Sequence, residues 1–383
     1  ERVYSMIVGF SGFGFPKAHG AAFGLLAYQS TWLRVHYGPE FLCALLNEQP
    51  MGFYATDTLA HEAQRRGIPM LPADVNESAA ECTVAAGGAV RIGLGYVTGV
   101  RADEVAALVA AREEGGRFRS LADLASRAGA GRPSLEKLAW AGACDALAGI
   151  ESGTDGANRA RRSALWQLGV AAPGDPVREG TQLALPLDTP APPELRELAP
   201  WESMVADYAT TGLTLGEHPM ALLRDRLPEQ AVTCRDLEKM RHEASVTIGG
   251  LVVARQRPGT AKGIVFLLLE DEFGTINLIV PPDVYERHRL TVRMEPLILA
   301  HGRLEKLAMA GGAINVFVKT LEPLVTPDED VAGVVELAER RAAAAAPEAP
   351  ADRSAAGADP SAILADFRGV APAVQSFAAG RRR

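Results

Sequence analysis

A glycine-rich run near the start of the chain has the residue types that hold phosphate. It is GFSGFGFPKAHG, residues 9–20, in which Gly12 and Gly14 let the backbone turn tightly and approach a ligand closely. Lys17 and His19 follow at the expected start of a helix, where backbone amides and the helix dipole favour an anion. We expect these four residues to bind a nucleotide or a DNA phosphate. A solvated glycine turn is the alternative interpretation.

A second pattern, VTGV at residues 97–100, precedes an amphipathic stretch at 102–112 and is typical of a helix–hairpin–helix unit. Such hairpins bind DNA phosphates through backbone amides, without reading the base sequence. We expect Gly99 to form the turn, Arg101 to replace the usual second glycine with a cation, and Arg112 to form a phosphate patch with Arg117 and Arg119. A weaker second unit is expected at residues 138–147. An ordinary corner between helices explains either unit equally well.

The hydrophobic period changes to that of strands between residues 245 and 324. A helix at 283–288 is expected between the third and fourth of five strands, which is the OB-fold pattern. The strands are expected at residues 245–255, 264–270, 275–280, 296–307 and 313–324. Basic residues beside an aromatic residue form the usual platform for single-stranded DNA, and the candidates here are Arg255, Arg257, Lys262 and Phe266. The alternative is a core phenylalanine with a solvated basic rim.

Between these regions lies a proline-rich, acidic stretch, residues 171–230, with 10 Asp and Glu against 4 Arg. It is expected to be a linker. It contains the apolar peptide QLALPL, residues 182–187, which resembles the short peptide that binds bacterial polymerases to the sliding clamp. A random apolar patch is the alternative, but we expect clamp contacts from Gln182, Leu183, Leu185 and Leu187.

Composition restricts the remaining functions. The net charge of −8 requires that any DNA contact come from local patches. The four cysteines, at positions 43, 82, 144 and 234, form no C-x-x-C pair, so we expect neither a zinc site nor a disulfide. No apolar run has the roughly 18 to 20 residues that a membrane span needs. The acidic runs at 270–272 and 328–330 are expected to be solvated turns rather than Mg²⁺ ligands, and we expect no bound cofactor.

The order of these motifs resembles the C-family DNA polymerases of bacteria, namely the replicative alpha subunit (DNA polymerase III alpha) and its error-prone relatives. The run at residues 9–23 is similar to the end of the family's fingers domain, and HYGPEF at 36–41 is similar to a turn that follows it. MGFY at 51–54 and PADVN at 72–76 are similar to the error-prone branch. Pro16 and Gly20 depart from the usual Asn and Ala.

The resemblance implies a multidomain α+β fragment that begins within the fingers. Its expected parts are the fingers end at 1–80, helix–hairpin–helix at 81–170, the linker at 171–230, an OB-fold at 231–325 and a disordered tail at 326–383. It implies the C-terminal part of a cytoplasmic error-prone DNA polymerase of repair, damage-induced mutagenesis and translesion synthesis.

The expected partners are primer–template DNA, the sliding clamp and mutagenesis accessory proteins, but no membrane. The palm carboxylates would belong to the intact enzyme. The intact enzyme would therefore bind Mg²⁺ and the incoming dNTP and add nucleotides, and the fragment alone is expected to be inactive. Two alternatives remain: a stand-alone DNA-binding or clamp-binding accessory protein, and the replicative alpha subunit.

Overall fold

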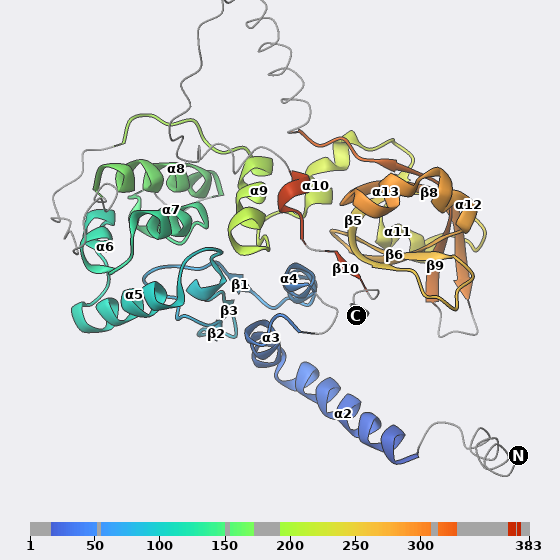
Figure 1. The fold of residues 1–383 in the computed structure, drawn as a ribbon, viewed down its shortest axis with the longest axis horizontal. Helices are drawn as coiled ribbons and strands as arrows, with labels where there is room; N and C mark the ends of the chain where they lie inside the picture. Colours follow the sequence, from blue (N-terminus) through green and yellow to red (C-terminus); the bar gives the residue numbers. More distant parts are fainter. Residues whose placement is uncertain are drawn as a thin grey trace, which may run out of the picture.

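The computed structural model of the chain describes residues 17–51, 55–149, 154–171, 192–307, 313–327, 367–372 and 374–376. Three helices come first. Helix α2 projects away from the rest of the fold (Figure 1), and α3 and α4 follow it. A proline in the first turn of α3 is suited to that position because its missing N–H has no partner there in any helix. The bounds are Lys17–His36 for α2, Gly38–Asn47 for α3 and Thr56–Arg65 for α4. The start of α2 was predicted from the sequence.

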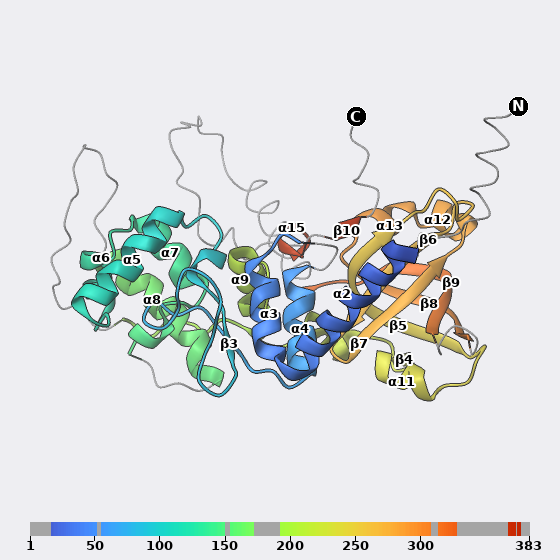
Figure 2. The ribbon, with the colours of Figure 1, turned by 90° about the horizontal axis from the view of Figure 1, so that it is seen from below.

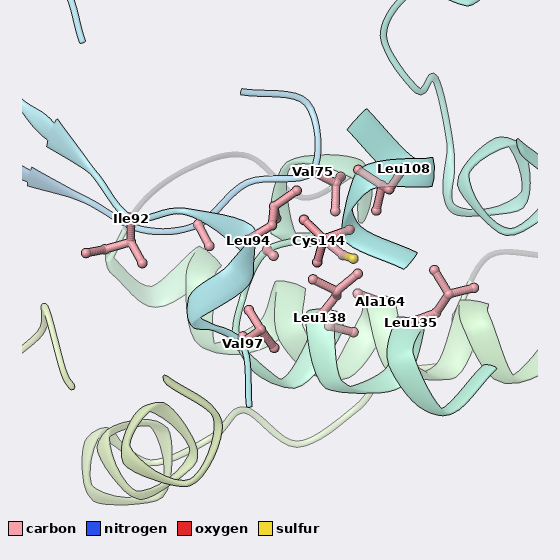
Figure 3. Packing of buried hydrophobic residues seen from close by; sticks show 14 of the residues in the cluster. Val75, Ile92, Leu94, Val97, Leu108, Leu135, Leu138, Cys144 and Ala164 are labelled. Atoms are coloured by element: carbon pink, nitrogen blue, oxygen red, sulfur yellow. The ribbon is translucent and has the colours of Figure 1, made fainter. Parts of the chain in front are cut away.

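A small sheet and four helices form the next lobe. Strands β2 (Thr83–Val84) and β3 (Val90–Arg91) pair antiparallel, and β1 (Met70–Leu71) adds in parallel. The helices are α5 (Ala102–Gly115), α6 (Leu121–Arg127), α7 (Arg132–Trp140) and α8 (Thr154–Ala171). Figure 3 shows how their buried side chains meet those of the preceding loop, among them Leu94, Val97, Leu108, Leu138 and Cys144.

Residues 192–230, expected to belong to the linker, instead include two packed helices. Helix α9 (Pro200–Thr211) and α10 (Pro219–Leu223) lie between the helical lobe and the barrel (Figure 1). The correction has a simple cause, because α9 places Trp201, Met204, Val205 and Tyr208 in one buried cluster. The abundant prolines concealed this apolar spacing in the sequence.

The expected OB-fold is confirmed as a closed five-stranded barrel. Its strands pair in the order β5-β6-β7-β9-β8, and β8 returns to β5. The bounds are β5 Ser245–Gln256, β6 Val265–Asp271, β7 Gly274–Val280, β8 Leu297–Leu307 and β9 Ala313–Pro323. Helices α12 (Pro282–Arg287) and α13 (Arg289–Met294) lie between the third and fourth strands, while β4 (Ala231–Val232) and α11 (Cys234–Lys239) precede the barrel (Figure 2).

The tail expected to be disordered contains two described elements that return to the barrel. Helix α15 (Phe367–Val370) inserts a fully buried Phe367 against Trp201 and Tyr208. Strand β10 (Gln375–Ser376) then pairs in parallel with β5 at Ala254 and Arg255. Disorder is therefore the wrong description for these residues, since one aromatic side chain and a free strand edge hold them.

Candidate nucleic-acid interface

The first hairpin is a tight turn between a 3₁₀ turn at Leu94–Tyr96 and helix α5. Gly99 occupies the left-handed region with φ of 79°, which only glycine adopts without strain. The amide of Thr98 donates to the carbonyl of Thr210 at 2.7 Å. This bond fixes the hairpin to α9. It also occupies one of the hairpin amides that were expected to bind a DNA phosphate.

The helix that follows this hairpin begins with acidic partners of its own. The Arg101 amide donates to Glu104 Oε2 at 3.3 Å, and the Arg101 guanidinium pairs with Asp103. Burial acts to raise the pKa of Glu104, but hydrogen bonds from Ser134 and Gly131 outweigh it and lower that pKa. Arg101 is thus an exposed cation that already has a carboxylate partner, and phosphate would compete with Asp103 for it.

Lys137 on α7 supplies a cation at the hairpin that the sequence did not reveal. Its Nζ donates to the carbonyl of Gly99 at 3.2 Å. The two residues are 38 positions apart, so no local spacing could have indicated the pair. Lys137 is therefore added to the candidate phosphate ligands of this hairpin.

The arginines expected to form a patch behind the hairpin have different environments. Arg112 Nη1 donates to the carbonyls of Val75 and Ser78 at 3.0 and 2.8 Å. Arg117 pairs with Glu77, and Arg119 is exposed. Arg112 therefore ties α5 to the loop between β1 and β2 and does not present a free guanidinium to DNA.

The second hairpin is present where it was expected. Gly142 has φ of 77° and forms the turn between α7 and a short 3₁₀ helix, Asp145–Leu147. A Cβ atom at Gly142 would approach Arg161 Nη2 to 3.0 Å. This turn therefore faces a side chain of α8.

On the barrel, Phe266 lies on the outer face rather than in the core. Its two neighbours on β6, Val265 and Leu267, point into the barrel core. Strand register places Gln256, Phe266, Ile279 and Phe317 side by side across β5, β6, β7 and β9. All four are partly exposed. Two aromatic rings separated by one strand provide surfaces on which bases can stack.

The neighbouring row of the same face carries amides. Register aligns Leu268 with Asn277, and Asn277 with Asn315. These residues and Phe266 line a groove of about 610 Å³ whose opposite wall includes Ala55 and Thr58 beside and on α4. Side-chain amides donate and accept hydrogen bonds, so the groove combines stacking surfaces with groups that can contact base edges.

The basic residues expected to accompany Phe266 do not share its face. Arg255 donates to the Glu295 carbonyl at 2.5 Å, and burial lowers its pKa. The Arg257 guanidinium lies 4.5 Å from the centre of the Tyr285 ring. Lys262 is exposed in the β5–β6 loop, with φ of 50°. Side chains alternate along a strand, so Gln256, not Arg255, shares the face of Phe266, with which it pairs.

The other sequence candidates lie partly outside the described residues. Those outside the described ranges are Gly12, Gly14, the four clamp candidates and the acidic run at 328–330. Helix α2 begins at Lys17, as expected, and His19 is exposed with its ring 4.4 Å from that of Phe23.

The acidic run at 270–272 corrects an expectation. Its first two carboxylates are 0% and 1% exposed, so they are not in a solvated turn. Within the described part of the chain, no helix is long and apolar enough to cross a membrane.

Comparison with known families supports both DNA-binding modules. Residues 67–153 match the helix-hairpin-helix motif, and residues 246–324 match the OB-fold nucleic acid binding domain. The first match includes both hairpins, and the second includes the aromatic row of the barrel.

The chain is also 42% identical over 341 residues to an error-prone DNA polymerase of Anaeromyxobacter sp. strain K, covering 85% of this chain and 28% of that protein. The chain is a homologue of bacterial error-prone DNA polymerases. Error-prone DNA polymerases of Dechloromonas aromatica and Pseudomonas savastanoi are 39% and 38% identical, each over 85% of this chain. The chain spans less than a third of the length of these relatives, 28–31%.

Proposed function

We propose that this chain is the C-terminal, DNA-holding part of an error-prone DNA polymerase that acts in DNA repair and damage tolerance. The intact cytoplasmic enzyme would add nucleotides to a primer with Mg²⁺ and dNTP, and mutagenesis accessory proteins would be among its partners. Homology to error-prone polymerases over 85% of the chain supports the parent activity. The arrangement of the two DNA-binding modules supports the role of this part.

The aromatic row on the barrel is the observation that carries the DNA-holding role. Phe266 and Phe317 flank Ile279 on a partly exposed face, and base stacking on such rings contributes about 1 to 3 kcal/mol per base. The helix–hairpin–helix lobe would hold the duplex by its phosphates, while the barrel would hold the single-stranded template beyond it.

Exposed apolar side chains on α2 support a role within a larger protein. Large apolar patches on a soluble protein usually mark a surface that another protein covers. Residues along one 20-residue helix are between 42% and 68% exposed, and they are Phe23, Leu25, Leu26, Tyr28, Trp32, Leu33 and Val35. We propose that the polymerase palm and fingers cover them in the intact enzyme.

Binding of three DNA forms tests this proposal. The chain should bind a primer–template with a single-stranded overhang more tightly than either blunt duplex or single strand alone. Replacing both Phe266 and Phe317 with Ala should remove the preference for the overhang and leave duplex affinity unchanged. Phe273→Ala, which removes an exposed ring in a turn, is the matched control. Equal affinity for all three DNA forms would contradict the proposal. Primer extension by the chain alone would contradict the prediction that this part is inactive.

Two other functions remain distinguishable by experiment. A stand-alone accessory protein would carry the same modules. The reading frame upstream of residue 1 distinguishes the two: one that encodes a palm domain with clustered carboxylates favours the polymerase, and a start codon immediately before residue 1 favours the accessory protein. Binding to the clamp-loader tau subunit would favour the replicative alpha subunit instead.

A further inference from the structure

A group of buried polar side chains connects α4 to the barrel. His61 lies on α4, His218 immediately precedes α10, and Glu270 lies on β6. They are 4%, 7% and 0% exposed, and one ligand atom from each lies within 4.8 Å of the others. We propose that these three residues bind a divalent transition-metal ion of the zinc class, because two imidazoles and one carboxylate are a recurrent ligand set for zinc.

The atoms that would bind the ion have no hydrogen-bond partner. Both ring nitrogens of His61, Nε2 of His218 and Oε2 of Glu270 are buried and make no hydrogen bond, although each nitrogen of His61 has a carboxylate oxygen within 3.6 Å. A buried polar group without a partner destabilises the folded state. A metal ion would satisfy one atom from each of the three side chains.

The surroundings of His61 match those of a metal-bound histidine. Its Nδ1 lies 3.6 Å from Glu270 Oε1, and its Nε2 lies 3.5 Å from Asp57 Oδ1. Histidine ligands usually donate their second ring N–H to a carboxylate, which fixes the tautomer. Asp57 is itself held by the Tyr208 hydroxyl at 2.9 Å and the Thr214 amide at 3.2 Å. Nδ1 of His61 is therefore the nitrogen that would face the metal.

The charges of the cluster allow either a metal ion or a proton. Arg65 Nη1 lies 2.8 Å from Glu270 Oε1, which leaves Oε2 for the ion. When both are ionised, Asp57 and Glu270 carry two negative charges against the one positive charge of Arg65, so the cluster can accept a further cation. Burial raises the pKa of Asp57 to about 6. A protonated His61 would supply that cation in the absence of metal, and a divalent ion would displace that proton.

His218 must change its hydrogen bonding when the ion binds. Its Nδ1 accepts the amide N–H of Met220 at 3.1 Å, so the neutral ring carries its proton on Nε2. Binding a metal through Nε2 moves that proton to Nδ1, so the Met220 N–H loses its acceptor and two buried N–H donors face each other, a cost that metal binding must outweigh. The ligand atoms must also move closer by about an ångström to reach zinc–ligand distances of roughly 2 Å.

A pocket reaches the two histidines of the cluster. Its volume is about 410 Å³, and its lining includes both histidines together with Arg65, Arg235 and Glu272. Water in this pocket would complete a four-coordinate ion. Because the three ligands come from α4, the residue before α10 and β6, the ion would join the helical half to the barrel.

The test uses the full chain after removal of metal with EDTA. Zn²⁺ titrated by calorimetry should bind at one equivalent, and Co²⁺ should give the visible absorption of tetrahedral coordination. His218→Gln should weaken binding at least 100-fold, and Asp57→Asn should weaken it 10- to 100-fold by releasing His61. His288→Gln, which alters a histidine at the end of α12, should bind as the wild type does.

Circular dichroism of each variant identifies any failure to fold, and if His218→Gln does not fold, the Asp57→Asn measurement decides. A wild type that binds no Zn²⁺ contradicts the proposal. Zn²⁺ affinity that is unchanged in the folded variants contradicts it as well.

Discussion

Arg65 on α4 lies with its Nη1 2.8 Å from Oε1 of Glu270, a residue 205 positions later in the chain. Glu270 is fully buried on β6, and Arg65 is one-fifth exposed. The pair therefore joins the helix that precedes the small sheet to the wall of the OB barrel. This contact helps to fix α4 beside the outer face of the barrel, where Thr58 forms part of the wall of the proposed DNA groove.

Arg65→Ala should destabilise the chain by about 3 kcal/mol, because it leaves the buried Glu270 carboxylate without its cation. The measurement is urea unfolding with EDTA present. Arg66→Ala removes a neighbouring exposed arginine paired with Glu62 and should change stability by less than about 0.5 kcal/mol. Equal effects of the two substitutions would show that the pair with Glu270 contributes little.

Gly99→Ala should reduce duplex affinity several-fold. A Cβ atom at this position would lie 2.0 Å from Lys137 Nζ, so the lysine must leave its bond to the Gly99 carbonyl. The left-handed conformation adds a strain of about 1 kcal/mol. Gly87→Ala is the control, because Gly87 has φ of 80° and open space around it. Both variants should lose similar stability by thermal melting, and only Gly99→Ala should weaken DNA binding in fluorescence anisotropy.

The sequence predicted the elements well where the hydrophobic period was clear. The five barrel strands, the start of α2 and helix α5 lie within a few residues of their expected positions, because alternation and helical spacing are local properties. It predicted the composition of the sites less well. Phe317 reaches the row of Phe266 only through the pairing of β7 with β9. Lys137 meets Gly99 only through the packing of α7 against the hairpin. Such contacts depend on tertiary structure, and local patterns do not contain them.

Phe367→Ala should destabilise the chain by about 3 kcal/mol, the usual cost of removing a buried phenyl ring. The ring is 0% exposed, with its centre 5.3 Å from that of Trp201. Thermal unfolding measures the loss, and Phe273→Ala, at a ring that is 39% exposed, should have a much smaller effect. Hydrogen exchange should also be faster at Val370 and Ala371 in Phe367→Ala. Unchanged stability would mean that α15 does not hold the C-terminal segment on the barrel.

Replacing Gln182 and Leu185 together with Ala should reduce affinity for the sliding clamp by about 1 to 3 kcal/mol, as expected for anchor residues of a short binding peptide. Surface plasmon resonance with immobilised clamp measures the change. Val177→Ala alters an apolar residue of the same stretch outside residues 182–187 and should leave affinity unchanged. Equal clamp affinity in the wild type and the double variant would exclude this peptide as the clamp site.

Asp145→Asn should stabilise the chain more at high pH than at low pH. Burial raises the pKa of Asp145 to about 7, and Arg161 opposes the increase only in part. A carboxyl whose folded pKa is raised favours the folded state when protonated, and this contribution is lost as the pH rises from about 4 through 7. The amide variant has no such loss, so its stability relative to the wild type should increase over this range by at most ~4 kcal/mol. Urea unfolding at several pH values measures the difference.

Asp283→Asn, at an exposed carboxylate of α12, is the control and should give a stability difference that is nearly constant with pH. A constant difference for Asp145→Asn as well would mean that Asp145 is ionised at the same pH in the folded and unfolded chain.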